Sequence, residues 1–134
     1  PVSVNGDISS VGGAELALAQ SGAQGVMIGR AAYGAPWLPG RIGTFLKTGR
    51  DPGAPRFAEQ GRIALAHIEA MLVHYGEFHG LRNARKHIGW YLASSGADPA
   101  AVKSWRHLLC TDDDAASTLA NFASFYELPR EQAA

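Results

Sequence analysis

The fold is decided by two segments, PVSVNGDI at residues 1–8 and GVMIGRAA at residues 25–32. Each contains a short apolar run, Val2–Val4 and Gly25–Ile28, that predicts a β-strand followed closely by a glycine. Short apolar strands of this kind are typical of parallel sheets that are buried on both faces. The sequence therefore predicts two parallel strands near the beginning of the chain.

A helix is expected between these strands, because Ser9 or Ser10 can cap its start and Gly22 can close its end. A second helix is expected over residues 37–47, after an Ala-Pro pair, and Gly49 ends it. The order strand, helix, strand, helix corresponds to two successive βα units.

The segment 48–56 contains two glycines and two prolines and is the best candidate for a domain boundary. In a (β/α)₈ barrel, the loops after the seventh and eighth strands form a phosphate site at the catalytic face. We therefore expect residues 1–50 to be an α/β segment, the last two βα units of a TIM (β/α)₈ barrel. A complete barrel takes about 250 residues, so this one is incomplete, and the start at Pro1 is expected to be a cut.

Residues 56–134 predict an all-α domain of four helices. The first helix is expected over residues 57–77, and the second is expected to follow Gly80 and to end near Gly96. The core face of the second helix is a stripe at helical spacing, formed by Ala84, Ile88, Tyr91 and Leu92.

The last two helices have recognisable start signals. Asp98 is expected to cap the third helix, with Pro99 at its first position. Thr111, with Asp114 three residues further on, is a variant of the capping box and predicts the start of the fourth helix. The expected result is a four-helix carboxy-terminal domain.

Five residues after the two strands are candidates for binding a phosphate ester: Asn5, Gly6, Asp7, Gly29 and Arg30. Gly6 and Gly29 lack a Cβ, so their backbone N–H groups can approach an anion, although both could be simple turn formers. Arg30 precedes a short helical start and could hold the same anion, or form a salt bridge at the barrel rim. Asn5 and Asp7 could bind the polar chain of a cofactor or only stabilise their own turn. The combination favours binding.

A second candidate site lies on the second helix of the expected all-α domain. Arg82, Arg85, Lys86 and Gly89 are spaced i, i+3, i+4, i+7 and predict a basic exposed ridge. Phosphates of a folded RNA are natural partners for such a ridge. The alternative is a solvated face whose charges pair with neighbouring acids.

Composition narrows the remaining possibilities. The chain has 12 basic and 12 acidic side chains and one cysteine, which excludes an internal disulfide and favours a reducing cytoplasm. No apolar stretch approaches the roughly 20 residues of a membrane span, so no membrane partner is expected. No metal is expected either, because His67 and His74 are too few for a zinc site. Cys110 is expected to be a buried structural thiol.

Four segments together resemble a known family: NGDI at residues 5–8, MIGRAA at residues 27–32, PW at residues 36–37 and, above all, RNARKHIGWY at residues 82–91. They are similar to the carboxy-terminal part of bacterial tRNA-dihydrouridine synthases, and the resemblance extends from Pro1 to about Tyr126. It implies an FMN-containing barrel followed by a helical domain that holds tRNA. It also implies the roles of the candidate residues: Asn5, Gly6 and Asp7 would contact FMN, Gly29 and Arg30 its phosphate, and Arg82, Arg85 and Lys86 would face tRNA.

The resemblance further implies a reaction in which NADPH reduces FMN and the C5–C6 double bond of uridine in tRNA is then reduced. The catalytic cysteine of the family belongs to a part that this chain lacks, and Cys110 does not match it. We therefore expect no catalytic residue in this chain, and an inactive protein when the chain is alone. Two alternatives are a stand-alone helical RNA-binding module and part of another FMN-dependent barrel oxidoreductase.

Overall fold

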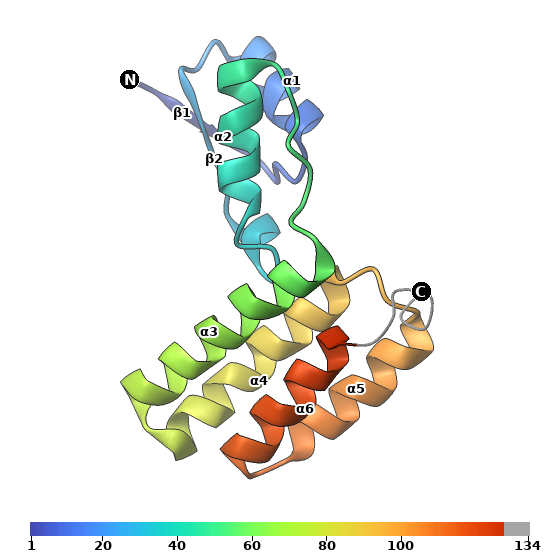
Figure 1. The fold of residues 1–134 in the computed structure, drawn as a ribbon. Helices are drawn as coiled ribbons and strands as arrows, with labels where there is room; N and C mark the ends of the chain where they lie inside the picture. The colour runs from blue at the N-terminus through green and yellow to red at the C-terminus, as the bar shows by residue number, and fades with distance from the viewer. Residues whose placement is uncertain (128–134) are drawn as a thin grey trace. The chain divides into compact units, whose positions relative to one another are not determined.

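A computed structural model of the chain describes residues 1–127, which form two compact units, Pro1–Pro55 and a second unit from Arg56 onward (Figure 1). The expected helical domain was assigned residues 56–134, and its last positions, 128–134, lie outside the described residues. The first unit contains both strands, and the second is entirely helical over the part described.

In the first unit, strand β1 (Ser3–Asn5) pairs with strand β2 (Gly25–Met27) in parallel, so the predicted pairing is confirmed. Helix α1 (Val11–Ser21) connects them. Its start is capped by Ser10, whose Oγ accepts a hydrogen bond from the Gly13 N–H at 3.0 Å. Its end is closed by Gly22 in the left-handed conformation, with φ of 67°.

The core of the first unit lies between the strands and two helices. Helix α2 (Leu38–Thr48) follows a single 3₁₀ turn, η1 (Arg30–Ala32), and ends at Gly49. The residues buried in this core are Ile8, Ala14, Leu38 and Ile42, and Val4, Val26 and Ile28 pack against them. This packing fixes the ends of both strands relative to α1 and α2.

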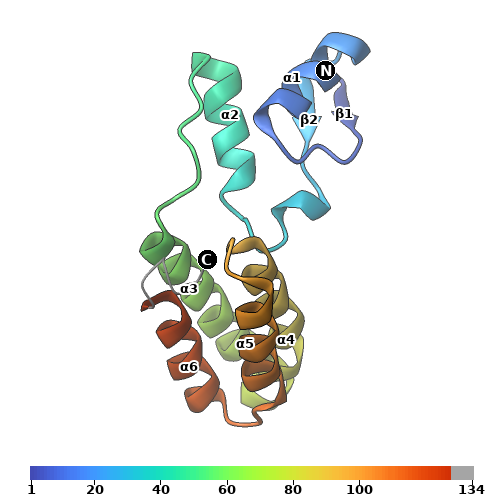
Figure 2. The ribbon, with the colours of Figure 1, turned by 90° about the vertical axis from the view of Figure 1, so that its right-hand side faces the viewer.

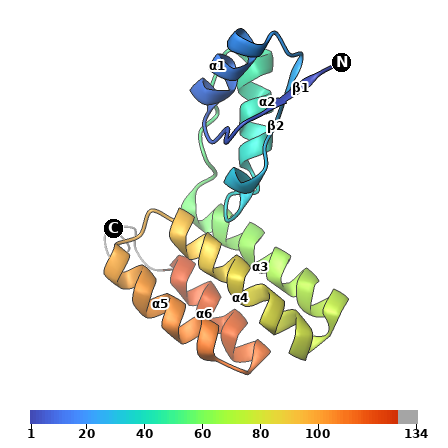
Figure 3. The same cartoon turned by 180° about the vertical axis from the view of Figure 1, so that it is seen from behind.

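The second unit consists, over the residues described, of helices α3 (Phe57–Tyr75), α4 (Glu77–Ser94), α5 (Pro99–Thr111) and α6 (Ala115–Glu127). Within this unit, α4 packs beside α3 and α5, and α6 packs beside α3 (Figures 2 and 3). The predicted core face of α4 is confirmed, because Ala84, Ile88, Tyr91 and Leu92 are all buried. Phe122 and Phe125 of α6 are also buried.

The expected start of the second helix after Gly80 is wrong. The break lies at Gly76, whose φ of 75° suits glycine, and Gly80 is inside α4. A Cβ added at Gly80 would lie 2.8 Å from the Cα of Leu72. Glycine is therefore required there because α4 and α3 come into backbone contact, and the sequence alone does not distinguish such a contact from a helix end.

The expected start of the fourth helix at Thr111 is also wrong. Thr111 is the last residue of α5, and its Oγ1 donates to the carbonyl oxygen of His107 at 2.7 Å. The cap is Asp114, whose Oδ1 accepts from the Ser117 N–H at 2.6 Å. The third helix begins as expected, because the Asp98 carboxylate accepts from Ala100 and Pro99 is at the first position.

Candidate cofactor hollow and basic face

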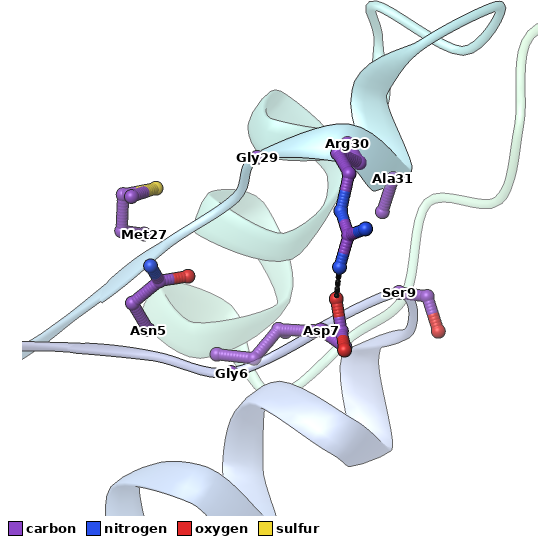
Figure 4. Close-up of a pocket in the computed structure, with 9 residues that line it drawn as sticks. Asn5, Gly6, Asp7, Ser9, Met27, Gly29, Arg30 and Ala31 are labelled. Carbon is purple, nitrogen blue, oxygen red and sulfur yellow. Dashed lines mark hydrogen bonds and ion pairs between the residues drawn. The ribbon is translucent and has the colours of Figure 1, made fainter.

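The parallel register brings the two glycine segments to one end of the sheet. Asn5 pairs with Met27, so the residues that follow each strand leave the sheet at the same edge. There they line a hollow of about 600 Å³ (Figure 4). All five candidate residues of this region are among its lining residues: Asn5, Gly6, Asp7, Gly29 and Arg30. The structure thus brings all five candidate residues together.

The two glycines leave the backbone open on the side of their missing side chains. A Cβ added at Gly6 would meet no atom within 4 Å, and one at Gly29 would reach only the Sδ of Met27, at 3.9 Å. Gly6 does not have a positive φ. Neither internal packing nor a left-handed turn therefore requires glycine at position 6. A bare backbone at a hollow is what close approach of a ligand needs.

Asp7 and Arg30 face each other across this hollow (Figure 4). The Nη2 of Arg30 donates to the Oδ1 of Asp7 at 2.7 Å, and both side chains are exposed, 78% for Arg30 and 82% for Asp7. Asp7 has φ of 46°, in the left-handed region that Asp tolerates better than most residues. The salt bridge considered for Arg30 is therefore present. The helical start after Gly29 is only the single turn η1, so it provides no helix end for an anion.

The prediction of a continuous, exposed basic ridge on α4 is wrong. Arg82 and Lys86 are exposed, but Gly89 is buried. Arg85 is only 29% exposed, and its Nη2 donates to the carbonyl oxygen of Asp112 at 3.0 Å and to the Oδ1 of Asp113 at 2.6 Å. Arg85 therefore connects α4 to the segment between α5 and α6. The pairing with neighbouring acids, considered as the alternative, applies to Arg85.

A residue that the sequence reasoning did not single out covers the end of this face. Arg106 of α5 lies against Gly89, and its Nη2 donates to the Gly89 carbonyl oxygen at 3.0 Å. The sequence of α5 does indicate a basic helix, because it contains Lys103 and Arg106 and no acidic residue. The position of Arg106 beside α4 could not be predicted from the sequence, because it depends on how α4 and α5 pack.

The remaining candidates have structural roles. The Sγ of Cys110 is 3.5 Å from the carbonyl oxygen of Arg85, and burial raises the pKa of this thiol, although Arg106 and Arg85 oppose the rise. A protonated, half-buried thiol is a poor nucleophile. His67 Nδ1 lies 3.0 Å from the Tyr91 hydroxyl at the α3–α4 contact. Burial lowers the pKa of neighbouring His87, with smaller contributions from His67 and Lys86.

Two other kinds of site have no candidate among the described residues. In residues 1–127, no three His, Cys, Asp or Glu side chains are grouped so that they could hold a metal ion. Over the same range, none of the helices has both the length and the apolar character that crossing a membrane requires.

Comparison with known proteins identifies the family. The family model described as dihydrouridine synthase (Dus) matches residues 1–127. The chain is 46% identical over 126 residues to a probable tRNA-dihydrouridine synthase of Rickettsia conorii, covering 94% of this chain and 37% of that protein. It is 39% identical over 131 residues to the tRNA-dihydrouridine synthase B of Pseudomonas putida, covering 98% of this chain and 38% of that protein.

A probable tRNA-dihydrouridine synthase of Rhodobacter capsulatus is 44% identical over 126 residues, again with 94% of this chain and 37% of the relative covered. The chain thus spans little more than a third of the length of these curated relatives. The resemblance seen in the four sequence segments is confirmed, and the chain belongs to the dihydrouridine synthase family.

Proposed function

We propose that this chain is part of a flavin-dependent tRNA-dihydrouridine synthase, which reduces uridine to 5,6-dihydrouridine in tRNA with NADPH as the reductant. The observation that carries the proposal is the combination of family membership with a glycine-lined hollow at the ends of two parallel strands. This chain spans 37% of the relative from Rickettsia conorii. We expect the catalytic cysteine and the other barrel strands to come from the remaining length, and the reaction to take place in the cytoplasm.

The residues of the hollow fit the anionic tail of FMN. The unobstructed backbone at Gly6 and Gly29 can present N–H groups to a phosphate, and Arg30 supplies a positive charge beside them. Asp7 bonds one amino group of Arg30, which restricts the guanidinium. The Asn5 amide can donate to and accept from the polar parts of the cofactor. FMN, when bound, supplies the hydride that reduces the uracil ring.

The helical unit is proposed to hold tRNA. A uridine inside a folded RNA must leave its stack to be reduced, which costs a few kcal/mol, so binding elsewhere on the RNA has to offset that cost. Arg82 and Lys86 are exposed and can contact phosphates. Arg85 faces the same partner, but its bonds to Asp112 and Asp113 hold it in place.

The test uses a chimera, because residues 1–127 contain two strands and an eight-stranded barrel needs more. Residues 1–127 would replace the matching segment of the Rickettsia conorii relative, and the purified chimera would be assayed for bound FMN and for dihydrouridine in tRNA. We expect both, and we expect Arg30→Ala to reduce FMN affinity about tenfold or more, the effect of removing a charged hydrogen bond. A folded chimera that neither binds FMN nor modifies tRNA would contradict the proposal.

A stand-alone helical RNA-binding module is the second candidate, since the unit from Arg56 onward has its own buried core. If this alternative is correct, the 134-residue chain binds tRNA, and variants of Gly6 or Arg30 have no effect on FMN binding or dihydrouridine formation by the chimera. FMN binding that depends on those residues would exclude it. The third alternative, another kind of FMN barrel, has no support from the family match.

A further inference from the structure

A second hollow lies on the helical unit, between α4 and α5. It has a volume of about 390 Å³, within the range of roughly 300 to 1,000 Å³ typical of small-ligand pockets. The residues that line it are Arg85, Lys86, Gly89, Trp90, Arg106 and Cys110. Three of these six are basic, one is aromatic, and none is acidic.

The walls of this hollow are held in place by contacts on both helices. Arg106 of α5 lies against α4 at Gly89, where its guanidinium bonds the Gly89 carbonyl oxygen. Trp90 packs edge-to-face with His87, the ring centroids being 4.9 Å apart, and His87 packs in turn on His67 of α3. These contacts hold Arg106 and Trp90 at the hollow.

The charge of the hollow is positive and only partly neutralised. Arg85 is paired with Asp113. Lys86 and Arg106 have different surroundings: α5 contains no acidic residue, and the only one in α4 is Glu77, at its first position. One amino group of Arg106 bonds Gly89, and a guanidinium has five N–H donors, so it can also bind an anion at the hollow.

We propose that this hollow binds one nucleotide of RNA whose base is unstacked. The phosphate lies at Lys86 and Arg106, and the base packs against the apolar surface of Trp90 and Cys110. The inference rests on the proposed function for its choice of RNA as the partner. An RNA duplex exposes phosphates but keeps its base faces stacked, whereas loops and single strands offer both groups together. The hollow therefore selects unpaired positions of the tRNA.

Cys110 provides a local reporter, because it is the only cysteine of the chain and it lines the hollow. The 134-residue chain would be alkylated with a maleimide, alone and with a saturating unmodified tRNA transcript, a single-stranded oligoribonucleotide or a blunt RNA duplex. We expect tRNA and the single strand to slow alkylation several-fold, and the duplex to leave the rate unchanged. If tRNA binds, as measured separately by fluorescence anisotropy, and the alkylation rate stays the same, the inference is wrong but the proposed function stands.

Substitutions test the phosphate contacts independently. Arg106→Ala and Lys86→Ala should each weaken tRNA binding about tenfold, as expected for loss of a charged hydrogen bond. Each should also reduce the slope of log K against log salt by about 1. The matched control is Lys103→Ala, which removes the same charge from α5 outside the hollow, and circular dichroism checks the fold of all three. Equal effects of the three variants would show general attraction and overturn the inference, while absence of any tRNA binding would overturn the proposed function as well.

Discussion

Replacing Gly80 with Ala should destabilise the helical unit, whereas the same change at Gly89, on the same helix, should not. Alanine is favoured over glycine in a helix by about 1 kcal/mol, so helix propensity alone would raise the free energy of unfolding equally in both variants. At Gly80 the new Cβ would lie 2.8 Å from the Leu72 Cα and 3.0 Å from the Met71 carbonyl oxygen, and backbone atoms cannot rotate away. At Gly89 the nearest atoms belong to the Arg106 guanidinium, at 3.6 to 3.7 Å, which is ordinary contact.

The magnitude follows from the cost of overpacking. Inserting a methyl group into a packed contact costs about 1 to 3 kcal/mol, and a clash with backbone places Gly80→Ala near the upper end. After the helical gain is subtracted, we expect a net loss of about 1 to 2 kcal/mol. For a unit of this size that loss lowers Tm by roughly 4 to 16 °C. Gly89→Ala should be neutral or should stabilise by up to about 1 kcal/mol.

The assay is urea unfolding of the 134-residue chain, followed by circular dichroism at a helix wavelength, with both variants measured beside the unsubstituted chain. The far-ultraviolet signal reports mainly on the helical unit, because α3 to α6 contain most of the helical residues described. If Gly80→Ala proves as stable as Gly89→Ala, then α3 and α4 do not approach closely enough for a Cβ at position 80 to clash. The assignment of Gly80 as a contact residue would then be abandoned.

Three further outcomes are expected. Asp114→Ala should cost about 1 kcal/mol through loss of the α6 cap, and Thr111→Ala less, which urea unfolding can compare. The hydrogen bond from Arg41 lowers the pKa of the Asp51 carboxyl from 3.8 to about 2. The stability that this pair contributes is therefore present above pH 3.8 and is lost as the pH falls through 2. An NMR titration should show the low pKa of Asp51 in the unsubstituted chain and a higher pKa in Arg41→Ala. Burial raises the pKa of Cys110 against the pull of Arg106, so Arg106→Ala should move the pH profile of maleimide alkylation further upward, and a profile that moves downward would contradict this account.

The sequence was sufficient to predict those features of the fold that depend on residues close together in the chain. The caps of α1 and α5 and the closing glycines of α1 and α2 are local properties of this kind. The sequence was also sufficient to bring Gly6 and Gly29 to one hollow, because parallel strands that pair in register must end at the same edge. That inference needs only the order of the elements and no knowledge of side-chain packing.

The sequence was insufficient where the reason for a residue lies on another element. Gly76 and Gly80 both suggest a helix end, but only Gly76 has a positive φ, and Gly80 is explained by the Leu72 backbone. In the same way, Thr111 and Asp114 both fit an N-cap, and the choice between them depends on where α5 ends. Local chemistry proposes the candidates in these cases, and tertiary packing selects among them.

The basic face shows why this distinction matters for function. Arg85 and Lys86 are adjacent and carry the same charge, yet the Arg85 guanidinium is bonded to Asp112 and Asp113 while Lys86 is exposed beside a hollow. Substituting Arg85 would break a contact between α4 and the α5–α6 segment as well as remove a charge. A loss of tRNA binding in Arg85→Ala therefore cannot by itself identify a phosphate contact. Lys86 is the better probe, because its exposed side chain can lose its charge while the bonds of Arg85 stay intact, whereas Arg106→Ala also removes the hydrogen bond to the Gly89 carbonyl oxygen.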